Sequence, residues 1–191
     1  MSATITVVTP ANLDADDTAL HDAIAAISKL FPATQYLVDY TVQVTDGVAA
    51  ILTWDSSLGV QPTTSEIQSA LADIKLSGYK SIQSGLIQAA YQNAAYNTPI
   101  AYMGTTFWTD SDSQFKVLGA AWGYGKAGAV PDGFAWWDAT GTAVPMTLAQ
   151  IEGLAQATLA EVEAAFVKRK SLLVAIAAAT TIAAVQAVVW S

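Results

Sequence analysis

Residues 107–115 read FWTDSDSQF, and aspartates that alternate with serines could bind a cation or act as general acid and base. A Ca²⁺ loop needs further oxygen ligands at regular spacing, and the acidic run ends at Asp112. A glycoside hydrolase needs two converging carboxylates, for which Asp110 and Asp138 are the pair that we can nominate. Helical spacing begins at Ser113, which places Asp110 at an N-cap and Asp112 in the first turn. We favour this capping role and expect no catalytic residue, no metal and no cofactor.

Two further patterns suggest chemistry that their spacing does not support. Residues 119–128 read GAAWGYGKAG, but the first glycine lies one residue too far from the Gly-Lys pair for a phosphate-binding loop. Ala127 also replaces the Ser or Thr that would bind Mg²⁺. His21 is the single histidine, and no G-x-S-x-G elbow accompanies it. We therefore expect a flexible loop at 119–128 and a solvated histidine.

The composition disfavours several classes of protein. Hydrophobic residues make up 53% of the 191 residues and charged residues only 13%, against about a quarter charged in ordinary soluble domains. This deficit predicts that other subunits cover part of the surface, with a membrane as the competing explanation. A net charge of -8 argues against nucleic-acid binding. The chain has no cysteine, which excludes disulfides and thiolate chemistry, and its amino terminus does not resemble a secretory signal.

Periodicity and turn residues predict an α+β fold. We expect a small β-α-β-β unit over residues 1–60, and over residues 61–191 a mixed unit with short antiparallel strands and a helical carboxyl end. The elements predicted for the first half are a strand at 3–10, a helix at 14–31, a hairpin at 35–54, a helix at 65–75 after a Thr63-x-x-Glu66 capping box, a break at Ser77-Gly78, and a helix at 79–96. Two strands around Gly104 follow, and then a helix that begins at 113 and gives way to the loop at 119–128. The last predicted elements are a hairpin at 133–144, a helix from the Thr147-x-x-Gln150 capping box to Lys170, and a short helix ending at Trp190.

The apolar tail is open to two interpretations. Residues 171–190 carry no charge, are about as long as a bilayer-spanning helix, and follow a basic triplet at 168–170. The run is mostly alanine, however, and Thr180 and Thr181 are natural helix caps in its middle. We favour two helices packed within protein, with the triplet complementing the negative end of the preceding helix. A membrane anchor is the alternative.

Several segments occur in a distinctive order over roughly residues 79–190. They are YKSIQSGLIQAAY, GTTFWTDSDSQFKVLGAA, FAWWDATGTAV, PMTLAQIEGLAQATLAEVEAAF and LLVAIAAATTIAAVQAVVW. This order resembles a phage tail-associated domain of unknown function, family 4376. Residues 138–141 depart from that family's compact Asp-Gly turn. The earlier stretch LTWDSSLGVQPTTSEI is more loosely similar to phage tail proteins. The resemblance implies a tail, baseplate or fibre-related protein and transfers no catalytic residue.

We predict a non-enzymatic virion protein of the phage tail, made in the host cytoplasm, that contacts other tail or fibre proteins and forms a homo-oligomer. The alternatives are a tail-fibre assembly chaperone, a glycan-active protein and a membrane-anchored tail protein. Aromatic residues are favoured as interface anchors, although core packing is the competing role for the hairpin tryptophans. The interface candidates are Trp122, Tyr124, Phe134, Trp136, Trp137 and Trp190.

Overall fold

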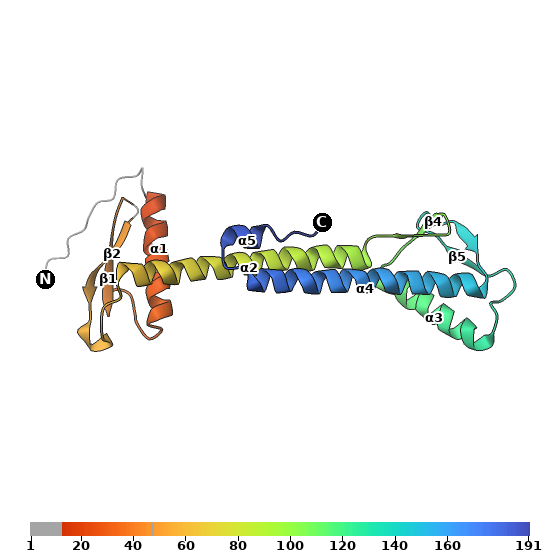
Figure 1. The fold of residues 1–191 in the computed structure, drawn as a ribbon, viewed down its shortest axis with the longest axis horizontal. Coiled ribbons are helices and arrows are strands. Elements are labelled where there is room, and N and C mark those ends of the chain that lie inside the picture. The colour runs from red at the N-terminus through yellow and green to blue at the C-terminus, as the bar shows by residue number, and fades with distance from the viewer. Residues whose placement is uncertain (1–12, 47) are drawn as a thin grey trace. The chain divides into compact units, whose positions relative to one another are not determined.

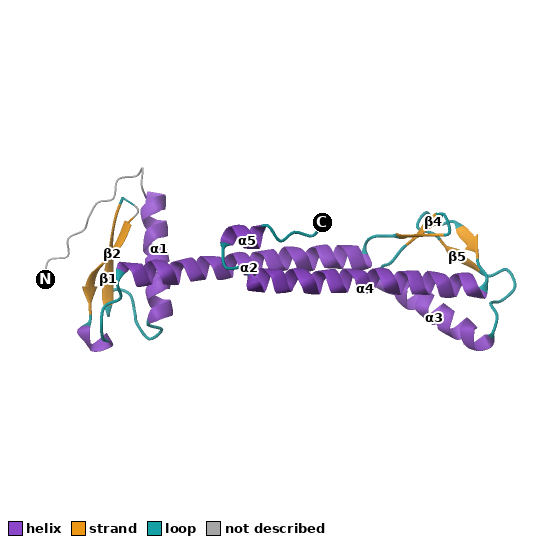
Figure 2. Ribbon diagram, viewed as in Figure 1, coloured by secondary structure: helices purple, strands orange, loops and turns teal. Residues whose placement is uncertain are grey.

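A computed structural model of the protein describes residues 13–46 and 48–191, and it confirms the α+β fold (Figures 1 and 2). The strand predicted at 3–10 lies outside the described residues. The chain divides into two compact units between Gly78 and Tyr79, and the predicted boundary after residue 60 stays a prediction. The elements are α1 (Leu13–Leu30), β1 (Tyr40–Thr45), β2 (Val48–Trp54), the 3₁₀ helix η1 (Ser56–Leu58), α2 (Thr64–Tyr96), β3 (Ile100–Tyr102), β4 (Thr105–Phe107), α3 (Ser111–Ala127), β5 (Ala135–Trp137), β6 (Ala143–Pro145), α4 (Leu148–Ala178) and α5 (Ile182–Gln186).

In the first unit, α1 packs against the β1–β2 hairpin, and the predicted hairpin is confirmed. Ile27 of α1 is fully buried, and Phe31 meets Trp54 edge-to-face with 4.9 Å between ring centroids. Lys29 forms an ion pair with Asp73 of α2 at 2.9 Å. Aromatic packing and exposed ion pairs therefore hold α1 to its neighbours, and the packing supplies most of the stability because exposed pairs contribute little.

Helix α2 is continuous, so the predicted break at Ser77-Gly78 is wrong. A glycine inside a helix costs about 1 kcal/mol relative to alanine, but unlike proline it keeps its backbone N–H. The start of α2 agrees with the predicted capping box: the Thr63 amide donates to the Glu66 carboxylate at 2.7 Å, and the Glu66 amide donates to the Thr63 hydroxyl at 3.2 Å. A single glycine thus weakens this helix without ending it.

The main core of the second unit lies among α3, α4 and two small hairpins. Strand β3 pairs with β4 and strand β5 with β6, both antiparallel, which confirms the two predicted strand pairs. Met103 and Gly104 make the first turn with positive φ angles of 54° and 81°. The buried side chains of this core come from the β3–β4 hairpin, from both helices and from the residue directly after β6; they are Ile100, Phe107, Val117, Met146, Ile151, Leu154 and Ala155.

Helix α3 extends through the glycine-rich segment, so the loop predicted at 119–128 is wrong. The helix ends at Gly128, which has a φ of 79° and donates its N–H to the Tyr124 carbonyl at 2.8 Å. Packing on α4 explains the extension. A Cβ at Gly125 would stand 3.1 Å from the Glu152 carboxylate, so glycine permits the close approach of the two helices. Tertiary contact outweighs the weak helix propensity of these glycines.

Helix α4 continues to Ala178, so its predicted end at Lys170 is wrong. The basic triplet consequently lies inside the helix and does not complement a helix end. Lys168 lies 4.9 Å from the centroid of the Trp190 ring, and Arg169 lies 5.1 Å from that of Tyr91. These cation–π contacts give two of the three basic residues partners in the second unit.

Thr181 is the N-cap of α5, as predicted, but this helix ends at Gln186 and not at Trp190. Beyond it the backbone is held by side chains, because the Gln83 amide donates to the Val188 carbonyl at 2.6 Å. Trp190 packs beside the buried Tyr91 of α2. Within residues 13–46 and 48–191, no helix combines the length and apolar character needed to cross a bilayer.

Candidate protein–protein interface

The acidic segment at the start of α3 is a helix cap. One carboxylate oxygen of Asp110 accepts hydrogen bonds from the amides of Asp112 and Ser113, each at 3.1 Å. The other accepts from the Ser113 hydroxyl at 2.6 Å. The hydroxyl and amide of Ser113 hold the pKa of Asp110 below its usual value, because these bonds favour the charged form. Asp112 pairs with Lys116 one turn later, which confirms its first-turn position.

Asp138, the second nominated carboxylate, shapes the β5–β6 turn. It accepts hydrogen bonds from the Thr142 amide at 2.8 Å and from the Thr140 amide and hydroxyl at 2.9 and 2.7 Å. The Thr105 hydroxyl of β4 donates to its other oxygen at 3.2 Å. The Thr142 amide is the main cause of the lowered pKa of Asp138. A general acid requires a raised pKa, so neither Asp110 nor Asp138 has the electrostatics of one.

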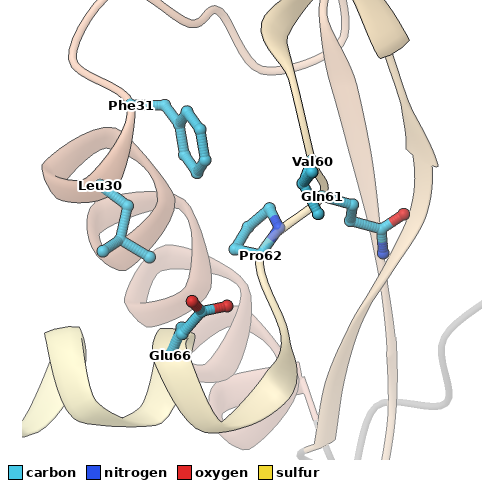
Figure 3. A pocket seen from close by; sticks show the side chains of 6 residues that line it. All are labelled: Leu30, Phe31, Val60, Gln61, Pro62 and Glu66. Carbon is cyan, nitrogen blue, oxygen red and sulfur yellow. The ribbon is translucent and has the colours of Figure 1, made fainter.

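Two pockets in the described part of the chain are small. The one in the first unit has a volume of about 160 Å³ and is shown in Figure 3, whereas ligand sites usually measure roughly 300–1,000 Å³. Its single carboxylate, Glu66, is engaged in the capping box with Thr63. A pocket of about 260 Å³ in the second unit includes Glu161. In the described part of the chain, no group of three or more His, Asp or Glu residues could hold a metal ion. His21 is exposed and pairs with Asp17 at 3.4 Å.

Four of the six aromatic interface candidates pack within the second unit. Tyr124 and Phe134 meet edge-to-face with 5.1 Å between ring centroids. Trp136 lies 6.4 Å from Phe134 and packs with it against the core. Trp190 is half-buried beside Tyr91. Core packing, the competing role weighed for the hairpin tryptophans, therefore describes Trp136.

The remaining two candidates project outward. Trp122 is 71% exposed and Trp137 is 67% exposed. Phe115, also on α3, is 78% exposed. The helical period could have shown this, because Phe115 and the buried Val117 are two residues apart and point to different faces. Phe115 and Trp122 are seven residues apart and share one face with Gly119 between them. We call these three residues the α3 face.

Two known protein families match parts of this chain. Residues 68–189, more than half of the sequence, match the family described as Domain of unknown function (DUF4376). The chain belongs to the DUF4376 family. Residues 23–76 match a second family, described as XkdW protein. XkdW is a phage-like protein family, and this match points to a phage-related protein. No curated protein and no solved structure matches the chain.

The DUF4376 match covers both small hairpins, α3 and α4, so it includes the α3 face and five of the six aromatic candidates; the sixth, Trp190, follows directly after the matched residues. The XkdW match ends at residue 76, within α2. The two matches overlap in the first turns of that helix, which belongs to both compact units. The predicted resemblance of the carboxyl-terminal part to family 4376 is therefore confirmed as membership of this family, whereas the phage relation rests on the XkdW match to the amino-terminal part.

Proposed function

We propose that this DUF4376 protein is a non-enzymatic structural component of a phage tail, baseplate or fibre that is retained in the virion after synthesis in the host cytoplasm. The observation that carries the proposal is the α3 face. Phe115 and Trp122 hold large aromatic rings in solvent on a helix whose opposite side is anchored in the core. Such exposed aromatic side chains are typical anchors of protein–protein interfaces.

The surface chemistry supports a protein partner. The net charge of -8 opposes binding to phosphate backbones. The two carboxylates nominated for catalysis, Asp110 and Asp138, are occupied in a helix cap and a turn. Only 13% of the residues are charged, so few charged side chains are available to keep the surface in contact with water. This composition suits a chain whose surface is largely covered by neighbouring subunits in an assembly. The expected partners are other tail or fibre proteins.

The test compares purified virions with the infected-cell lysate by quantitative mass spectrometry. A structural component is present at a fixed stoichiometry in virions. An assembly chaperone, the alternative, is present in the lysate and depleted from virions, and that result would overturn the proposal.

A variant pair links this test to the α3 face. Phe115→Ser with Trp122→Ser removes the aromatic anchors, and Val60→Ser is a matched control because Val60 is also highly exposed but lies in the first unit. We expect the α3-face variant to be lost from virions and the control to be incorporated normally. Equal incorporation of both would show that the α3 face is not the contact.

A further inference from the structure

Helix α4 carries a second exposed apolar surface, distinct from the α3 face. Leu159, Phe166, Val167 and Val174 are between 48% and 63% exposed. Glu163 and Lys170 are also exposed and lie among them. At 100° per residue all six fall within a band about 100° wide on one side of the helix. We call this set, Leu159, Glu163, Phe166, Val167, Lys170 and Val174, the α4 stripe.

The α4 stripe has the same spacing when it is read in either direction. The intervals between successive members are four, three, one, three and four residues. Its ends are apolar, its centre is apolar, and one charged residue lies between centre and end on each side. The two charges are opposite: Glu163 on one side and Lys170 on the other. A surface with this pattern is self-complementary about a two-fold axis through its centre.

The two charged residues do not satisfy each other within the chain. Glu163 and Lys170 are seven residues apart on α4, about 10.5 Å along the axis, which is too far for an ion pair. Among the described residues, neither takes part in any of the four ion pairs of the structure. Their one-turn neighbours on the helix carry no opposite charge. Both are therefore available to a partner.

The area of the stripe suits a weak to moderate dimer. The four apolar side chains expose on the order of 400 Å² in one copy. Two copies would bury about 800 Å² of apolar surface, and with the usual apolar share of roughly 60% the interface would reach about 1,300 Å². This lies near the lower end of the range for specific protein–protein interfaces, which starts at about 1,200 Å².

We propose that the α4 stripes of two copies of this chain pack antiparallel about a two-fold axis. Leu159 of each copy then faces Val174 of the other, Phe166 faces Val167, and Glu163 faces Lys170 twice. A parallel, in-register pair would instead set Glu163 against Glu163 and Lys170 against Lys170, and the like charges would oppose association. The proposal deepens the proposed structural function, on which it rests, by naming a second copy as one partner and the surface that it uses.

Charge reversal in the purified full-length protein tests the proposal, with association followed by sedimentation velocity. The single variants Glu163→Lys and Lys170→Glu each place like charges at both symmetric contacts, so we expect dimerisation to weaken about tenfold or more. The double variant Glu163→Lys/Lys170→Glu restores both pairs and should dimerise within about twofold of the original chain. An equimolar mixture of the two single variants should form a heterodimer, because each supplies the charges that the other lacks.

Lys126→Glu is the control, because it reverses an exposed charge on α3 outside the stripe; we expect no change in association. All the altered residues are exposed or half-exposed, and circular dichroism checks that each variant is folded. A chain that remains monomeric at about 100 µM, well above the micromolar range of an interface of this size, overturns the proposal. Single charge reversals that dimerise like the original chain also overturn it.

This experiment and the virion experiment fail separately. A monomeric chain that is nevertheless incorporated into virions would overturn the two-fold contact and leave the structural function standing. A chain that dimerises but is depleted from virions would overturn the structural function and leave the two-fold contact standing.

Discussion

The contact between α4 and the β3–β4 hairpin allows a precise test of the packing in the second unit. Gly153 of α4 faces Tyr102 of β3. A Cβ at position 153 would stand 2.2 Å from the Tyr102 hydroxyl oxygen and 3.2 Å from Cζ of the same ring. Tyr102 is itself packed edge-to-face on the buried Phe107, with 6.5 Å between ring centroids. The Gly153→Ala substitution therefore forces the tyrosine ring against its own neighbour or moves the strand away from the helix.

Two opposing free-energy terms set the size of the stability change in Gly153→Ala. Alanine gains about 1 kcal/mol of helix propensity over glycine in a helix interior. Overpacking of a core contact costs roughly 1–3 kcal/mol. We expect the packing cost to exceed the gain, with a net loss of about 1 kcal/mol in the free energy of unfolding. For a chain of this size that loss lowers Tm by about 2–4 °C.

The assay is urea and thermal unfolding followed by circular dichroism, with Gly119→Ala as the matched control. No atom lies within 4 Å of a Cβ added at Gly119 in α3, so this variant should gain about 0.5–1 kcal/mol. Adding Tyr102→Phe to Gly153→Ala removes the nearest atom and should recover part of the loss. Gly153→Ala with stability equal to or above that of the original chain would refute the packing argument.

Three further predictions concern other elements. Gly78→Ala in α2 should raise the free energy of unfolding by about 0.5–1 kcal/mol in urea denaturation, because the helix is continuous there and no atom lies within 4 Å of an added Cβ. A lower free energy of unfolding would indicate that the helix is interrupted at Gly78. Asp110→Ala should lower the free energy of unfolding by about 1 kcal/mol, because the substitution removes the N-cap of α3. The pKa of Asp110 is lowered in the folded state, so this difference should be complete above about pH 4 and should shrink as the pH falls through the folded pKa; a constant difference would contradict the cap. Phe115→Ser/Trp122→Ser should change stability by less than about 0.5 kcal/mol per site in the same assay, because both side chains project into solvent; a larger loss would place them in the core.

Much of the local structure could be predicted from the sequence because its causes are local. The capping boxes at Thr63 and Thr147 depend on residues three positions apart. The role of Asp110 followed from its place before a helical pattern. The β5–β6 hairpin followed from apolar runs around the turn at residues 138–141. In each case the interacting groups lie within a few residues of one another, so their spacing alone determines whether they meet.

The wrong predictions concern glycines and helix ends. A break at Gly78 and a loop at 119–128 were expected because glycine has weak helix propensity. Position 125 shows why propensity was insufficient, since α3 approaches α4 so closely there that glycine suits the contact. The predicted end of α4 at Lys170 is wrong. Lys168 and Arg169 contact aromatic rings from other parts of the chain, and the local sequence does not show such contacts.

The sequence by itself determined the α+β class, the caps, the hairpins and the DUF4376 family, because these rest on periodicity, short-range hydrogen bonds and motif order. It also identified the aromatic residues as interface candidates. Only the tertiary structure separated them: Phe134 and Trp136 are packed against the core, whereas Trp122 and Trp137 project into solvent. Burial depends on which surfaces meet across the fold, and those surfaces come from segments far apart in the chain. The same reason explains why the exposed α4 stripe emerges only once the opposite side of that helix is known to be buried.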